Sequence, residues 1–156
     1  NNKMKQANWV NNSYRNTKVN WAKSQQAIMK ILSDVGIEQI RFTNLPDRHV
    51  LEFVNKEEGK IPKGVRIVTP LVSKVSDNPD KRNKELNVIH RILFNHLKAK
   101  FLAIASGLTE FEQEFMAHLI ITDKHGNSTT LGEQMLPQYN KYLKDGDGQF
   151  LLDSGK

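Results

Sequence analysis

Residues 79–105 read PDKRNKELNVIHRILFNHLKAKFLAIA, and this stretch decides the fold that the sequence predicts. It follows Asn78, a residue type that caps helix starts, and opens with Pro79 at the one helical position that suits proline. Gly107 comes two residues after its end and is a typical helix stop. Apolar side chains recur between these signals every three or four residues: Leu86, Ile89, Leu93, Leu97, Phe101 and Ile104. The pattern predicts a helix roughly 40 Å long that lays one apolar stripe against the core.

The opposite side of the same helix is basic. Lys84, Arg91 and Lys98 follow one another at intervals of seven residues, with Asn87 and Asn95 beside them. Seven residues are nearly two helical turns, so the three cations form a line along one face. This division between a core face and a basic face is the main functional hint in the sequence.

The composition favours a single soluble domain that binds a polyanionic partner. The 156 residues include 23 Lys and Arg against 17 Asp and Glu, which gives a formal net charge of +6. Such a surplus favours polyanionic partners, nucleic acid first and an anionic membrane second, although charge can also serve solubility alone. The absence of cysteine excludes disulfides, thiolate metal sites and a Cys nucleophile. No apolar run approaches the length of a membrane span, so we expect a cytoplasmic protein without a membrane partner.

The first twenty residues are predicted to form a flexible basic arm. They are rich in Asn and show neither helical nor alternating apolar periodicity. Trp9 and Tyr14 interleave with four cations: Lys3, Lys5, Arg15 and Lys18. Aromatic rings stack on bases while cations meet phosphates, so the arm is a candidate for contacts with a single strand. The simpler alternative is a tail whose Trp9 packs onto the domain or a neighbouring subunit.

Residues 21–152 are predicted to form one α+β domain. An amphipathic helix over residues 24–35, extended backward by Trp21, precedes three short strands over residues 37–43, 50–54 and 64–71. The strands form an antiparallel meander, and the two helices are expected to cover one side of it. The other side of the sheet is then exposed and carries Arg41, Arg48 and Arg66.

Two shorter helices are predicted after the long one. Thr109 and Glu112 match a capping box, and apolar residues at positions 111, 115 and 119 continue the pattern as a helix. A brief extended piece over residues 120–122 and a turn follow. Thr130 and Glu133 repeat the capping pattern and open a last helix to about residue 143, which Pro137 must bend or shorten. The apolar trio at positions 150–152 is expected to dock the C-terminal tail.

A further pattern starts at Arg91 and covers residues 91–93, 97–101, 103–104, 107–108, 111–115, 120–123, 126, 130, 137–139 and 146–152. With this pattern the chain resembles small uncharacterised proteins of bacteriophages and related mobile elements. The resemblance extends over roughly residues 24–152 and is strongest from 91 to 139; it departs where Lys124 and His125 are inserted before Gly126. Such proteins have no assigned activity, so the resemblance implies a mobile-element origin and no catalytic residues.

Two residues of the long helix break its apolar sector, His90 and Lys100. A buried lysine is costly unless it is paired, and Glu112 or Glu114 in the following helix are the expected partners. The alternative is a lysine that contacts an anion from a groove.

The sequence contains no strong catalytic or metal motif. Glu114, His118, Asp123 and His125 are acceptable ligand types for a divalent metal, but they lack a third fixed helical ligand. No Gly-rich phosphate loop, G-x-S-x-G or H-E-x-x-H motif occurs. We therefore expect no enzymatic activity, no metal and no cofactor.

Two hypotheses remain. The first is a nucleic-acid-binding accessory protein of a phage or mobile element that contacts DNA or RNA largely without sequence preference. Its candidate contacts are Lys84, Arg91, Lys98, Arg41, Arg66, Trp9 and Arg15. The second is a protein-interaction module, either an inhibitor of a host enzyme or a subunit of a larger assembly, including a homo-oligomer. A contiguous basic surface favours the first, and a large exposed apolar patch favours the second.

Overall fold

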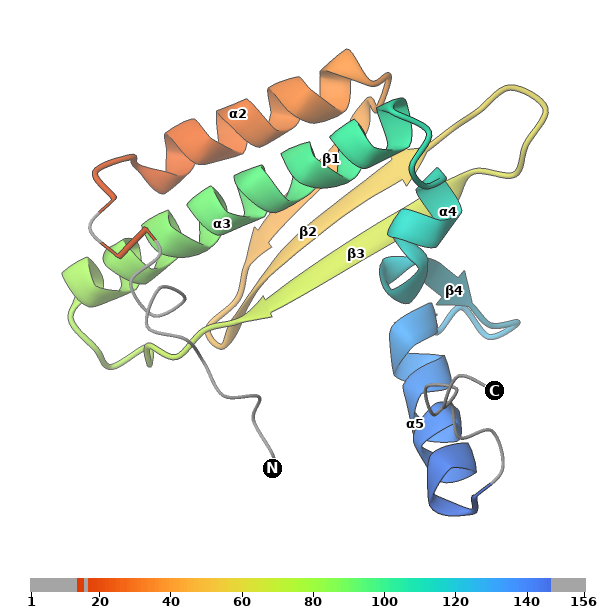
Figure 1. Cartoon of the computed structure of the whole chain (residues 1–156). Helices are drawn as coiled ribbons and strands as arrows, with labels where there is room; N and C mark the ends of the chain where they lie inside the picture. The colour runs from red at the N-terminus through yellow and green to blue at the C-terminus, as the bar shows by residue number, and fades with distance from the viewer. Residues whose placement is uncertain (1–13, 16, 147–156) are drawn as a thin grey trace, which may run out of the picture.

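The computed structural model describes residues 14–15 and 17–146, which form an α+β fold (Figure 1). The elements are α2 (Trp21–Asp34), β1 (Gln39–Asn44), β2 (Arg48–Asn55), β3 (Lys63–Pro70), α3 (Pro79–Ala105), α4 (Phe111–Glu114), a 3₁₀ turn η1 (Met116–His118), β4 (Ile120–Thr122), β5 (Ser128–Thr130) and α5 (Leu131–Lys144). The predicted order of helix, three strands, long helix and two shorter helices is confirmed.

The first three strands form an antiparallel meander in the order β1-β2-β3. Its register places Phe42 opposite Leu51 and Leu51 opposite Ile67, so one apolar row crosses all three strands. Because side chains alternate along a strand, the neighbouring positions point to the other face. The alternation that was read from the sequence is therefore confirmed.

Helices α2 and α3 lie side by side on one face of this sheet and leave the other face uncovered by helices (Figure 1). The core lies between the two layers and consists of Ile28, Leu32, Ile37, Leu51, Phe53, Val65, Ile67, Leu93, Leu97, Phe111 and Phe115. Leu86 is buried as well. The apolar stripe of the long helix thus packs where its periodicity predicted.

The start of α2 is fixed by polar contacts from both sides. Asn20 is its N-cap, and its Oδ1 accepts a hydrogen bond from the main-chain N–H of Ala22 at 2.8 Å. The main-chain N–H of Trp21 donates to Oδ1 of Asn87 on α3, also at 2.8 Å. The Trp21 ring lies 5.7 Å from that of His90, between their centroids. These contacts begin the helix at Trp21, the residue by which the apolar pattern extended the predicted helix backward.

The helix predicted over residues 109–119 is wrong in both its cap and its length. Glu110 is the N-cap in place of Thr109, and its main-chain N–H donates to Oε1 of Gln113 at 3.2 Å. Only one α-helical turn forms before η1 takes over. The chain leaves the helix because Phe115 fills the core and Leu119 pairs with Val65 at the sheet edge.

The C-terminal part forms a hairpin of β4 and β5 followed by α5, which extends away from the two-layer body (Figure 1). The Thr130 hydroxyl caps α5 by accepting from the N–H of Glu133, but the Glu133 carboxylate binds the Thr129 hydroxyl instead of closing a capping box. Pro137 lies inside α5, which begins at Leu131 and is not restricted to the part after the proline.

Among the described helices, none combines the length and apolar composition needed to cross a lipid bilayer.

Candidate functional site

The basic line of α3 is present on the outer side of the helical layer. Lys84 and Lys98 are exposed, and Arg91 is half-buried. No carboxylate among the described residues forms an ion pair with any of the three. The guanidinium of Arg91 lies over the ring of Phe94, 4.9 Å from its centroid, which holds this cation against the helix surface.

The acids of α3 do not neutralise this line. The helix has six basic and two acidic side chains. Glu85 accepts hydrogen bonds from the main-chain N–H groups of Val72 and Ser73, so its carboxylate is committed to the loop before the helix. Burial alone would raise the pKa of Glu85, but hydrogen bonds from Ser73 and Val72, together with the charge of Arg82, outweigh it and lower the pKa. Asp80 lies in the first turn, where the helix dipole favours it.

The cations at the start of α3 have structural roles instead. Arg82 donates to the main-chain oxygens of Leu45 at 2.6 Å and Pro46 at 2.9 Å, and so binds the β1–β2 turn to the helix. Lys81 pairs with Asp77 at 3.3 Å. The candidate phosphate contacts of α3 therefore begin at Lys84.

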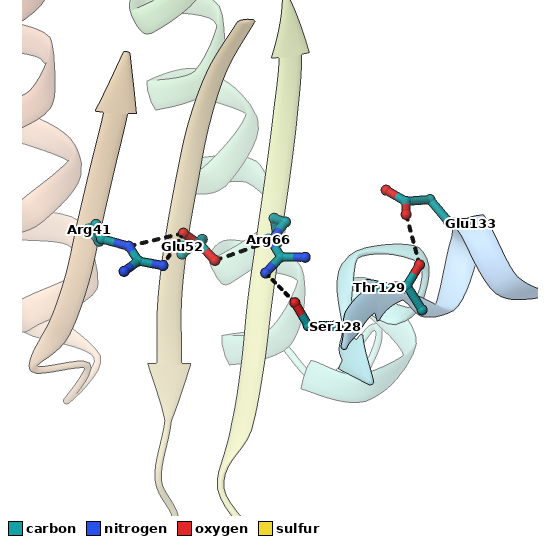
Figure 2. Close-up of polar contacts among 6 residues, drawn as sticks. All are labelled: Arg41, Glu52, Arg66, Ser128, Thr129 and Glu133. Atoms are coloured by element: carbon teal, nitrogen blue, oxygen red, sulfur yellow. Dashed lines mark hydrogen bonds and ion pairs between the residues drawn. The ribbon is translucent and has the colours of Figure 1, made fainter. Parts of the chain in front are cut away.

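The uncovered face of the sheet carries Arg41, Glu52 and Arg66 in one row across three strands (Figure 2). Glu52 Oε1 accepts from Arg41 Nη2 at 2.7 Å and from its Nε at 3.0 Å. Glu52 Oε2 accepts from Arg66 Nε at 3.1 Å, and Arg66 Nη2 donates to the Ser128 hydroxyl at 3.0 Å. The row binds the three strands together and connects the sheet to the β4–β5 hairpin.

This row reduces the positive charge that the sequence predicted for the sheet. Burial alone would raise the pKa of Glu52, but the hydrogen bonds and charges of Arg41 and Arg66 lower it, so the carboxylate stays ionised. The side chain of Arg66 is only 22% exposed, against 71% for Arg41. Arg48, on the same face, pairs with Asp47 at 3.1 Å. We therefore rank the sheet arginines below the α3 line as candidate contacts with a polyanion.

Of the two arm residues among the predicted contacts, Trp9 lies outside the described residues. The apolar trio at positions 150–152, which was expected to dock the tail, also lies outside them. Arg15 is exposed in a turn that precedes α2.

Two of the four residues that were weighed as metal ligands, Asp123 and Glu114, make other contacts. Oδ1 of Asp123 accepts from the N–H groups of His125 and Asn127, which closes the turn between β4 and β5. Glu114 pairs with Lys100 at 3.1 Å. Within residues 14–15 and 17–146, no group of three or more His, Asp or Glu side chains is placed to hold a metal ion.

A second surface, which the sequence reading missed, is an apolar groove between α5 and η1. It has a volume of about 660 Å³, and the side chains that line it include Met116, Met135, Leu136, Tyr139 and Tyr142. These five side chains are exposed over 45 to 59% of their surfaces. Gly132 permits the close approach of the two walls, because a Cβ there would lie 2.8 Å from the main-chain oxygen of Ala117. The signal was present as apolar residues at positions 135, 136, 139 and 142, which share one side of a helix.

Two buried histidines lie beneath the helical layer. The rings of His49 and His90 meet edge to face, 4.4 Å between centroids. His90 has partners for both nitrogens: Nδ1 lies 2.7 Å from the main-chain oxygen of Leu86, and Nε2 lies 3.0 Å from Nε2 of Gln25. Neither ring nitrogen of His49 has a hydrogen-bond partner among the described residues. Burial, and to a smaller extent the charge of His90, lowers the pKa of His49 to about 4.

Comparison of the chain with protein families, curated proteins and solved structures gave no match.

Proposed function

We propose that the chain is a nucleic-acid-binding accessory protein of a phage or mobile element that contacts the phosphate backbone through the outer face of α3. The observation that carries this proposal is the line of Lys84, Arg91 and Lys98, which has no acidic partner among the described residues. At a rise of about 1.5 Å per residue, successive cations of the line are roughly 10 Å apart along the helix axis. That spacing suits contacts with separate phosphates and provides no reading of base edges, so binding is largely independent of sequence.

The distribution of charge along the chain supports the same interface. Residues 1–105 contain 19 of the 23 basic and 9 of the 17 acidic side chains, whereas residues 106–156 are net acidic. The excess of positive charge therefore belongs to the part of the chain that contains α3. A polyanion is attracted to that part and repelled by the C-terminal part, which orients the encounter.

The proposal is tested by a mobility shift against single-stranded and double-stranded oligonucleotides at several salt concentrations. The triple variant Lys84→Ala, Arg91→Ala, Lys98→Ala is expected to bind more weakly. Each phosphate contact that is lost lowers the slope of log affinity against log salt by roughly 0.7 to 0.9, so the slope is expected to flatten by about two units. A wild-type protein that shifts no oligonucleotide at low salt would overturn the proposal.

A matched control separates the interface from net charge. Lys56, Lys124 and Lys144 are exposed, lie outside α3 and form no ion pair among the described residues, so replacing them by alanine removes the same charge elsewhere. This control is expected to leave the salt slope nearly unchanged, because long-range attraction is screened beyond about 10 Å at moderate salt. Equal losses in both triple variants would show that only net charge matters and that α3 is no interface.

A protein-interaction module is the second candidate, and the apolar groove beside α5 is the observation that favours it. Exposed apolar patches that are contiguous and rimmed by polar residues often mark interaction sites. The groove and the α3 line are different surfaces, so variants at Tyr139 test this candidate without changing the cations.

A further inference from the structure

We propose that the apolar groove beside α5 is a self-association site, in which α5 of a second copy of this chain lies antiparallel to α5 of the first. The inference gives the second candidate function a definite partner and rests on that candidate. It concerns neither α3 nor its cations, so the nucleic-acid proposal does not depend on it.

Helix α5 lacks packing partners beyond its first turn. Every side chain from Glu133 to Tyr142 is exposed, whereas Leu131 and Gly132 are half-buried. Isolated helices shorter than about 12 to 15 residues are only marginally stable in water, and α5 has 14 residues with Pro137 among them. The stability of α5 therefore depends on packing of its apolar side, which the described part of the chain supplies only at the first turn.

The exposed apolar side chains of α5 form one stripe. A helix turns about 100° per residue, so Met135, Leu136, Tyr139 and Tyr142 lie within an arc of roughly 120°. The exposed part of the stripe runs from Met135 to Tyr142. Its midpoint lies between residues 138 and 139.

The charges along one edge of this stripe are self-complementary. From Glu133 to Lys144 the helix makes roughly three full turns, so both side chains lie on the same edge of the stripe. Their midpoint also lies between residues 138 and 139. Neither forms an ion pair among the described residues, and the Glu133 carboxylate binds only the neutral hydroxyl of Thr129, at 2.7 Å.

One two-fold axis through this shared midpoint satisfies both patterns. Such an axis, perpendicular to the helices, reverses the second helix and keeps each edge of the stripe on the same side of the pair. Met135 of each copy then faces Tyr142 of the other, and Glu133 of each copy faces Lys144 of the other. An unrelated partner does not require the two midpoints to coincide, so their coincidence favours a second copy.

The groove has room for the reversed helix. Met135 lines it from α5 and Met116 lines it from η1, so Tyr142 of the second copy, level with Met135, lies between the two walls. The groove volume is about 660 Å³. Packed protein interiors contain few voids larger than a water molecule, so a space of this size is suited to large side chains from a partner.

The area of the stripe predicts a weak dimer. Five large groove side chains are exposed over 45 to 59% of their surfaces. At roughly 200 Å² for a fully open large side chain, they amount to roughly 500 Å² per copy and roughly 1,000 Å² in a symmetric pair. This is the lower end for specific interfaces, so we expect dissociation in the micromolar range.

The shape of the molecule permits this pairing. Helix α5 extends away from the two-layer body (Figure 1). An antiparallel pair therefore places the two bodies at opposite ends of the paired helices, where the positive charges of the two N-terminal parts do not meet.

The proposal is tested first by sedimentation of the full-length chain at concentrations from about 1 to about 300 µM. The wild type is expected to change from monomer to dimer over this range. Tyr139→Ser removes a ring beside the axis from both copies, so it is expected to weaken the dimer roughly a hundredfold. Gln134→Ser is the matched control, because Gln134 is exposed on the other side of α5 and does not line the groove; it is expected to change nothing.

A charge exchange tests the register of the pair. Glu133→Lys is expected to weaken the dimer roughly tenfold, because each copy then brings two lysines together, and adding Lys144→Glu is expected to restore it. Adding Lys141→Glu instead gives the same net charge but is expected not to restore it, because Lys141 lies on the opposite side of the helix. Lys144→Ala, which only removes the attraction, is expected to have a smaller effect than Glu133→Lys.

Two outcomes would overturn the proposal. A wild type that stays monomeric over the whole range would assign the groove to a different protein or to another part of this chain, and the second candidate function would then stand without a second copy. A dimer that Tyr139→Ser does not weaken, or that both charge exchanges restore equally, would place the contact elsewhere. Circular dichroism of each variant under monomeric conditions separates loss of the dimer from loss of folding.

Discussion

The ammonium of Lys100 lies 3.1 Å from Oε1 of Glu114 and 3.0 Å from the main-chain oxygen of the same residue. One residue of the segment after α3 therefore supplies both acceptors to a lysine that the helical phase places within the apolar sector. The ammonium also lies 5.4 Å from the centroid of the Phe115 ring. The predicted pairing of this lysine is confirmed, and Glu112, the other predicted partner, binds Lys63 instead at 2.7 Å.

Lys100→Met is expected to be tolerated far better than Lys100→Glu. The side chains of the pair are only 15% and 24% exposed, and methionine retains the apolar stem that packs at this position. A glutamate would face the Glu114 carboxylate and carbonyl without a counter-charge, at a cost on the order of 3 kcal/mol. Urea unfolding of both variants measures the difference.

The Lys63–Glu112 pair provides the comparison. Its side chains are more exposed, at 28% and 36%, so Lys63→Glu is expected to cost about 1 kcal/mol or less. If both methionine and glutamate at position 100 gave the same stability, the pairing would contribute nothing and the explanation would be wrong.

Acid is expected to destabilise the protein through His49 at pH values where most carboxylates are still ionised. Its pKa is lowered from the ordinary value of 6.5 to about 4, so the folded protein keeps it neutral where the unfolded chain binds a proton. The contribution of neutral His49 to the free energy of unfolding is fully present above pH 6.5, and it is lost as the pH falls from 6.5 towards 4. At about 1.4 kcal/mol per pKa unit, its size is on the order of 3 kcal/mol.

His49→Phe isolates this effect from the carboxylates and from His90, whose pKa burial also lowers. Phenylalanine retains a ring beside Phe42, 6.0 Å away between centroids, and removes two ring nitrogens that lack partners among the described residues. The variant is expected to lose less stability between pH 6.5 and 4.5 than the wild type. Parallel curves of unfolding free energy against pH would assign the acid sensitivity to other groups.

The sequence predicted best those elements whose local signals all indicate the same structure. α3 begins at Pro79 and ends at Ala105, as predicted, because the Asn78 cap, the proline and the long apolar stripe all indicate the same helix. After Gly107 the local signals disagree with the long-range packing. Thr109 and Glu112 match a cap, yet the burial of Phe115 and the pairing of Leu119 with Val65 end the helix after one turn. Such long-range packing is not visible in a local pattern.

The candidate site shows the same limit. Alternation correctly placed Arg41 and Arg66 on the uncovered face, but only the register of the strands reveals that Glu52 lies between them. A shift of one residue would send the glutamate to the other face and leave two unpaired arginines. The apolar periodicity of α5 could likewise be recognised in the sequence. Whether the apolar face of this helix is exposed depends on which elements pack against it, and the sequence does not show that.

The last prediction concerns the beginning of the domain. Asn20 caps α2 through the N–H of Ala22, and the Trp21 N–H that follows is held by Asn87. Asn20→Ala is expected to cost about 1 kcal/mol, because it leaves an N–H at the start of the helix without its side-chain acceptor. Asn20→Asp keeps an acceptor and adds a charge that the helix dipole favours, so it is expected to retain the stability of the wild type.

Deletion of residues 1–13, which contain few apolar side chains, is expected to leave the melting temperature nearly unchanged. A loss on deletion larger than that of Asn20→Ala would mean that Trp9 or Val10 packs against the domain, and the flexible arm would be the wrong description.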